Sequence, residues 1–122
     1  MPLTHDEIAA MTCEQVNKEI AIRLCQYYET PKPHGIISDY CHDWSHVGRL
    51  LDMMAQTLIP NTYTPSLGCD RKGVWDCYAY YDDVRSHDPV SQEAPTSTEA
   101  IARCWLEWYE VTHDYTDQVY HD

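Results

Sequence analysis

The chain has 122 residues, with 8 Lys and Arg against 20 Asp and Glu, and its formal net charge is −12. This length fits one domain, and a hydrophobic fraction of 43% with 4 Trp and 10 Tyr excludes an intrinsically disordered chain. The negative charge disfavours direct binding to nucleic acid or to an anionic membrane, and no apolar run approaches the ~20 residues of a membrane span.

Two capping boxes at the start of the chain predict two helices. Thr4 begins the pattern T-H-D-E, which predicts one short helical turn because Glu7 can reach back to the Thr4 amide. Thr12 begins a second capping box, T-C-E-Q, and the apolar residues after it recur at helical spacing. We therefore expect a longer helix over about residues 13–28, ended by the stretch T-P-K-P-H-G.

A further helix is expected to begin near residues 39–42. Asp39 or Cys41 can cap it, and Asp43 lies in its first turn, where a negative charge interacts favourably with the helix dipole. An apolar stripe at spacings of three and four follows, which predicts one buried face. The stripe consists of Trp44, Val47, Leu51, Met54 and Leu58.

After this helix, the apolar residues recur at every second position, which is the spacing of a strand. Trp75, Cys77 and Ala79 alternate with polar residues, which predicts a strand with one buried face. A poorer strand precedes it across the turn C-D-R-K-G, so we expect a hairpin. A third strand is expected at residues 84–87 or at residues 90–93.

The strongest helix signals lie near the C-terminal end. Thr96 and Glu99 form a capping box, and a broad apolar face follows. We expect Trp105 and Trp75 to be buried between this helix and the sheet, and residues 113–122 to form a frayed acidic tail. The opposite face of the helix is charged and is expected to be exposed; it carries Arg103, Glu107 and Glu110.

Together these elements indicate the α+β class, with a small antiparallel sheet and about three amphipathic helices. The chain has no internal repeat and no long linker, so residues 1–122 are expected to form a single domain with its core at about 12–112. The N-terminal residues lack a basic n-region and an apolar h-region, so no secretory signal is expected. We therefore expect a cytoplasmic protein whose six cysteines are reduced and unpaired.

Two segments carry a resemblance to a known family. One opens the helix after residue 38, and the other opens the last helix. The matching residues are Asp39, Tyr40, Asp43 and Trp44, and then Ala94, Pro95, Thr96, Glu99, Ala100, Ile101, Cys104, Trp105 and Leu106. With the Trp-bearing hairpin between them, they resemble the phage ABA-sandwich domain family, small phage and prophage proteins of mostly unassigned function. The resemblance covers roughly residues 12–112 and implies an α-β-α sandwich with no catalytic residues and no cofactor.

The motifs of common catalytic sites are missing from the sequence. It contains no G-x-S-x-G and no H-E-x-x-H, and its 4 glycines leave no phosphate-cradling loop, so we expect no enzyme. His42 and His46, spaced i and i+4 beside Cys41, form a zinc half-site. Zinc takes three or four ligands, so a solvated first helical turn is the commoner interpretation.

The acidic residues concentrate in the second part of the chain. Residues 1–75 carry 6 Lys and Arg against 9 acids, and residues 76–122 carry 2 against 11. An anionic face built there could imitate phosphates and fill a cationic nucleic-acid groove, although acids also serve solubility alone. Charge reversal on this face is expected to spare the fold. The candidate partner-binding residues are Asp82, Asp83, Glu107, Glu110, Asp114 and Asp117, with Tyr80 and Tyr109 among them.

Three functions follow from these patterns. The first is a small phage-encoded, non-enzymatic interaction protein of the bacterial cytoplasm. Like an anti-CRISPR protein, it would inhibit a host protein that has a basic, nucleic-acid-binding surface. It would bind neither nucleic acid nor membrane itself. The sequence is compatible with a homodimer. The second is a binder that sequesters a signalling nucleotide by aromatic stacking. The third is a zinc-binding or thiol-dependent protein.

Overall fold

The computed structural model describes residues 3–31, 35–56, 65–79 and 89–121, with side chains described as far as residue 112. The helices and strands in this part of the chain are α1 (His5–Ala10), α2 (Cys13–Tyr27), α3 (Trp44–Gln56), β1 (Ser66–Cys69), β2 (Trp75–Ala79), β3 (Val90–Ala94) and α4 (Ser97–His121). The predicted α+β class is therefore confirmed.

The two N-terminal helices begin as the sequence predicts. Thr4 Oγ1 accepts a hydrogen bond from the Glu7 amide at 3.2 Å, and Glu7 Oε1 accepts one from the Thr4 amide at 3.1 Å. Thr12 and Gln15 make the same reciprocal pair at 3.2 and 2.9 Å. Both capping boxes are confirmed, and they determine where α1 and α2 start.

α3 begins at Trp44, later than predicted, and Asp43 caps it. The Ser45 amide donates to Asp43 Oδ1 at 2.9 Å, and the Asp43 carbonyl accepts the first bond of the helix. The prediction that Asp39 or Cys41 caps this helix is therefore wrong. Both residues lie in the turn that precedes it.

The apolar stripe of α3 is buried except at its first position. Val47 and Met54 are fully buried and Leu51 is half-buried. Trp44 is 53% exposed, so the prediction that it belongs to the buried stripe is wrong. Leu58 lies outside the described residues.

The strands form an antiparallel sheet in the order β1-β2-β3. Asp70 Oδ1 accepts a hydrogen bond from the Val74 amide at 2.9 Å, and Gly73 takes a φ of 84°, so the predicted turn closes a β1–β2 hairpin. The third strand occupies the second of its two predicted positions, at Val90–Ala94. The other position, 84–87, lies outside the described residues.

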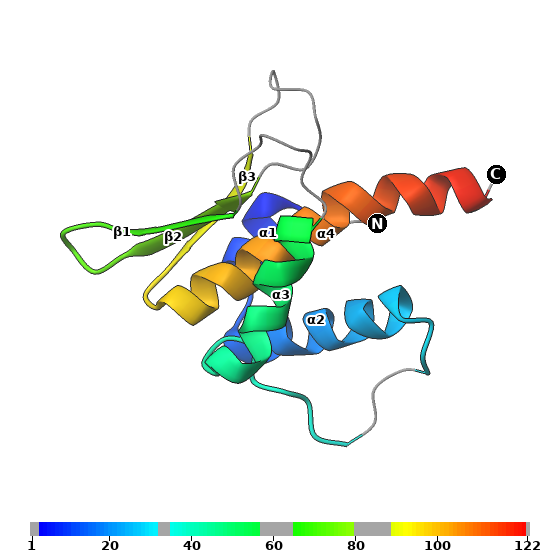
Figure 1. Ribbon diagram of the computed structural model, residues 1–122, viewed down its shortest axis with the longest axis horizontal. Coiled ribbons are helices and arrows are strands. Elements are labelled where there is room, and N and C mark those ends of the chain that lie inside the picture. The colour runs from blue at the N-terminus through cyan, green and yellow to red at the C-terminus, as the bar shows by residue number, and fades with distance from the viewer. Residues whose placement is uncertain (1–2, 32–34, 57–64, 80–88, 122) are drawn as a thin grey trace.

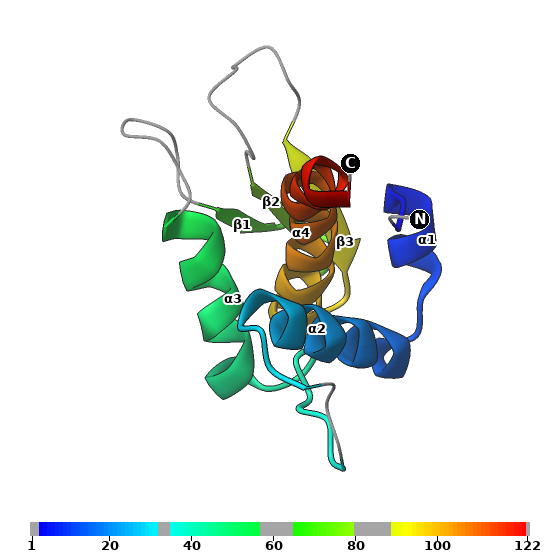
Figure 2. The same ribbon diagram turned by 90° about the vertical axis from the view of Figure 1, so that its right-hand side faces the viewer.

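α4 lies at the centre of the molecule (Figures 1 and 2). It packs along β2 and β3 and also contacts α1, α2 and α3. Figure 2 shows the strands behind α4, with α3 on one side of it and α1 on the other. The layers therefore run from the sheet through α4 to α2 and α3, and α4 is the described helix that covers the sheet.

The aromatic core lies along α4. Trp105 is fully buried, as predicted, and its ring centroid is 5.1 Å from that of Tyr109. Trp75 is only partly buried, at the margin of the same core. α4 continues to His121, so the expected frayed tail from residue 113 is helical instead. None of the described helices is both long and apolar enough to cross a membrane.

Candidate functional site

The charged face of α4 is buried, which corrects the prediction that it is exposed. Arg103 is 6% exposed and Glu110 is 8% exposed. The side chain of Glu107 is 12% exposed. These charges can be buried because α1, α2 and β3 supply a hydrogen-bonding or charged partner for each of them.

Arg103 links α4 to α1. Its Nε donates to Glu99 Oε2 at 2.9 Å, one turn earlier in the helix. Its two terminal nitrogens donate to the carbonyl oxygens of Ile8 at 2.6 Å and Met11 at 2.8 Å. These carbonyls lie at the C-terminal end of α1, so the guanidinium satisfies acceptors that a helix end leaves available.

Glu110 links α4 to α2. Arg23 Nε donates to Glu110 Oε1 at 2.8 Å, and a terminal nitrogen of Arg23 contacts the same oxygen. Arg23 also pairs with Glu19, one turn earlier in α2. Charge reversal at Glu110 would place a lysine against this buried arginine, so we expect it to destabilise the fold, unlike a change at an exposed position.

Glu107 and Tyr109 also make contacts inside the protein. Glu107 Oε1 accepts a hydrogen bond from Gln92 Nε2 at 2.6 Å and lies 2.7 Å from His5 Nδ1. Tyr109 is buried beside Trp105. The described members of the predicted partner-binding face are therefore internal. The others lie where side chains are not described: Tyr80, Asp82, Asp83, Asp114 and Asp117.

Two other acidic residues, the half-buried Asp76 and the exposed Glu93, lie on the outer sheet face, the face turned away from α4. We define this face by Ser66, Gly68, Asp76, Tyr78, Ser91 and Glu93, which alternate with the inward residues of the three strands. Asp76 is directly opposite Glu93 in the register of β2 and β3. On its other side, Asp76 faces Gly68, where a Cβ would lie 3.0 Å from Asp76 Oδ1. Two acidic residues thus occupy paired positions of β2 and β3 on this face, and the Asp76 carboxylate lies over Gly68.

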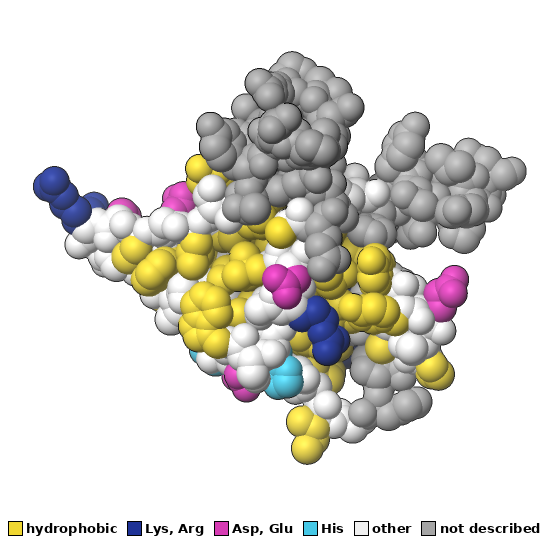
Figure 3. Space-filling view, in the orientation of Figure 1, with side chains coloured by type: hydrophobic (Ala, Val, Ile, Leu, Met, Phe, Trp, Pro, Cys, Tyr) yellow, Lys and Arg dark blue, Asp and Glu magenta, His cyan; other side chains and the backbone are white. Residues whose placement is uncertain are grey.

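Figure 3 shows one face of the molecule, on which hydrophobic side chains predominate among the described residues. Hydrophobic side chains lie along the β1–β2 hairpin and α3, and Lys and Arg side chains stand at the tip of the hairpin. Arg71 and Lys72 are the exposed cations of that turn.

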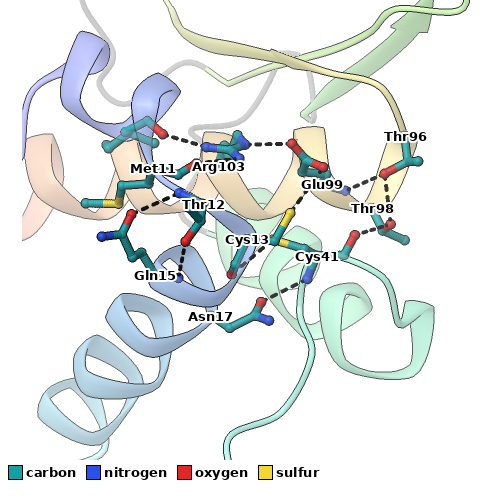
Figure 4. Close-up of polar contacts among 11 residues, drawn as sticks. Met11, Thr12, Cys13, Gln15, Asn17, Cys41, Thr96, Thr98, Glu99 and Arg103 are labelled. Carbon is teal, nitrogen blue, oxygen red and sulfur yellow. Dashed lines mark hydrogen bonds and ion pairs between the residues drawn. The ribbon is translucent and has the colours of Figure 1, made fainter.

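Three potential metal ligands from distant segments meet near the start of α4. Cys13 opens α2, His42 lies in the turn before α3, and Glu99 lies in the first turn of α4. Their ligand atoms all lie within 4.8 Å of one another. Figure 4 shows two of the three residues, Cys13 and Glu99, whose Sγ donates to Oε1 at 3.3 Å. We call these three residues the ligand cluster.

The segment that carries His42 is fixed to two helices through the backbone of Cys41 (Figure 4). The Cys41 amide donates to Asn17 Oδ1 of α2 at 3.0 Å, and its carbonyl accepts from Thr98 Oγ1 of α4 at 2.6 Å. The Cys41 thiol lies 3.7 Å from the carbonyl oxygen of Cys13. The position of the cluster is therefore determined by packed, hydrogen-bonded backbone.

The predicted zinc half-site of Cys41, His42 and His46 does not come together. His42 precedes the helix, so the i and i+4 geometry does not apply, and its Nδ1 lies 3.0 Å from both carboxylate oxygens of Asp39. His46 pairs with a different acid, and Cys41 is fully buried. The sequence patterns did not indicate Cys13 and Glu99 as potential ligands; their shared signal is that both lie in capping boxes.

The thiols near the core are poor nucleophiles. Burial raises the pKa of Cys13 and that of Cys41 above the ordinary value, and the nearby Glu99 raises the pKa of Cys13 further. A hydrogen bond with Cys77, together with burial, raises the pKa of Cys104. These three thiols are protonated at neutral pH, whereas an activated cysteine has a lowered pKa.

A cavity of about 330 Å³ lies between α2, residues 36–40 and α3. Tyr28, Tyr40 and Arg49 bring aromatic rings and a positive charge to it, and most of the remaining lining is apolar. Ligand cavities commonly measure about 300–1,000 Å³, so this volume lies at the lower end of that range.

The outer sheet face, the ligand cluster and the cavity are composed of different residues. Their chemistry suits a basic protein, a metal ion and a small anion, respectively. Comparison of the chain with family models, with curated proteins and with solved structures found no match.

Proposed function

We propose that this chain is a non-enzymatic interaction protein that binds a basic protein surface through the outer sheet face. In keeping with the resemblance to phage proteins, its partner would be a host factor of the bacterial cytoplasm that handles nucleic acid, and binding would inhibit that factor. The observation that carries the proposal is the pair formed by Asp76 and Glu93.

The pair favours a cationic partner for an energetic reason. Like charges directly opposite each other on neighbouring strands destabilise a sheet. A lysine or arginine from a partner would reverse the sign of this interaction and become the counter-ion of both carboxylates. Tyr78, next along β2 on the same face, adds a half-exposed aromatic ring of the kind enriched at protein interfaces.

The internal ion pairs leave the net acidity of the surface unchanged. Arg23 and Arg103 are committed to buried contacts with Glu110 and Glu99. Each pair buries one positive and one negative charge, so the chain outside these pairs keeps the full net charge of −12. Such an imbalance accelerates association with a basic protein at low ionic strength.

The test compares two double variants with the same change in net charge. Asp76→Asn with Glu93→Gln removes the sheet pair, and Glu14→Gln with Asp52→Asn removes two exposed acids from α2 and α3. A partner captured from host lysate, identified and purified, is used to measure association rates at several salt concentrations. We expect the sheet variant to associate at least about tenfold more slowly at 0.01 M salt, where the Debye length is about 30 Å, and the control to associate like wild type.

Equal rates for the two double variants would contradict the proposal, because the charge would then act without regard to position. Glu19 is unsuitable as a control, since it pairs with Arg23. Circular dichroism of each variant verifies that the fold is intact.

The cavity supports a second candidate function, the sequestration of a small aromatic anion such as a signalling nucleotide. Tyr28 and Tyr40 can stack on a base, which contributes about 1–3 kcal/mol per base, and Arg49 can bind a phosphate. Native mass spectrometry of the purified chain should then show a bound nucleotide that Arg49→Ala loses. Arg71→Ala, at the exposed hairpin turn, is the matched control and should retain it.

A further inference from the structure

The ligand cluster has the donor atoms of a zinc site. Cys13 offers sulfur, His42 nitrogen and Glu99 oxygen, and these atoms lie within 4.8 Å of one another. Zinc bonds of about 2.0–2.3 Å place ligand atoms roughly 3–4 Å apart, so small side-chain movements complete the site. Mixed sulfur, nitrogen and oxygen donors suit zinc, whereas magnesium and calcium prefer oxygen alone.

We propose that Cys13, His42 and Glu99 bind one Zn²⁺ ion and thereby join the starts of α2 and α4 to the turn before α3. The Cys13 thiol now donates its hydrogen to Glu99. On binding, zinc takes the place of that proton between the sulfur and the carboxylate, and the proton leaves to solvent. Three protein ligands leave a fourth coordination position for water.

The residues around the cluster are arranged as supports for its ligands. His42 Nδ1 lies 3.0 Å from both carboxylate oxygens of Asp39 and donates a hydrogen bond to them in one of its two tautomers. In that tautomer the lone pair is on Nε2, and a carboxylate partner of this kind is typical of zinc-binding histidines. Asn17 Nδ2 donates to Asp39 Oδ1 at 3.0 Å and so orients that carboxylate. Arg103 holds the second oxygen of Glu99, which leaves Oε1 directed at Cys13.

The cluster is also open to an incoming ion. The side chain of His42 is 56% exposed, that of Glu99 is 13% exposed, and Cys13 is half-buried. An ion can therefore enter past the imidazole without unfolding the helices. Because His42 is exposed, its substitution tests metal binding with little effect on the fold.

The experiment titrates the reduced, chelator-treated full chain with Zn²⁺ alone by calorimetry. We expect one ion per chain, a rise in Tm as zinc is added, and a thiolate-to-metal absorption band when Co²⁺ replaces zinc. Cys13→Ser and His42→Gln should each weaken zinc binding by at least about tenfold, and Asp39→Asn by about 10–100-fold.

Two matched controls separate this cluster from other thiols and imidazoles. Cys25→Ser removes another half-buried thiol of α2, and His46→Gln removes the second histidine of the sequence motif. Both should bind zinc like wild type. The proposal is overturned if no saturable binding occurs, if Cys13→Ser and His42→Gln bind normally, or if His46→Gln loses the ion.

Discussion

Replacing Trp105 with alanine is expected to lower the free energy of unfolding by about 3–5 kcal/mol. Trp105 is fully buried on the central helix, where it packs against Tyr109. The truncation removes a large apolar surface and leaves a cavity that rigid neighbours on several elements cannot fill. Because small domains are stable by only about 5–15 kcal/mol, urea denaturation should show a much lower midpoint.

Trp44 is the matched control for this substitution. It is 53% exposed at the first position of α3, so Trp44→Ala should change the unfolding midpoint far less. An unchanged midpoint for Trp105→Ala would mean that the apolar face of α4 is oriented differently from the one described.

Replacing Arg103 with methionine is expected to destabilise the protein by about 3–5 kcal/mol, because it breaks a buried ion pair from one side. Glu99 would lose the guanidinium that neutralises it, and the carbonyls of Ile8 and Met11 would lose their donors. Urea denaturation in the presence of a chelator measures this effect without any contribution from metal.

Two comparisons isolate the cause of that loss. Arg71→Met removes the same type of charge from an exposed turn and should alter stability by no more than about 0.5 kcal/mol. Arg103→Met combined with Glu99→Gln removes both charges, so it should be less destabilised than the sum of the two single variants. Full additivity would show that the pair is not coupled.

Local signals in the sequence were sufficient for most of the secondary structure. The capping boxes at Thr4 and Thr12 act over three residues, so they could be recognised without knowing what packs nearby. The alternation around Cys77 likewise identified the inward face of β2. The start of α3 was misplaced because several adjacent residues can cap a helix, and Asp43 does so.

The α+β class, the buried Trp105 and the excess of acid could all be predicted without a structure, since they depend on periodicity and composition. Which charges are exposed depends on how the helices pack against one another. A helical pattern places Arg103 and Glu110 on a charged face, but it does not reveal that α1 carbonyls and Arg23 lie against them. The ligand cluster could not be predicted for the same reason. Cys13 and Glu99 are 86 residues apart, and the packing of α2 against α4 brings their side chains together.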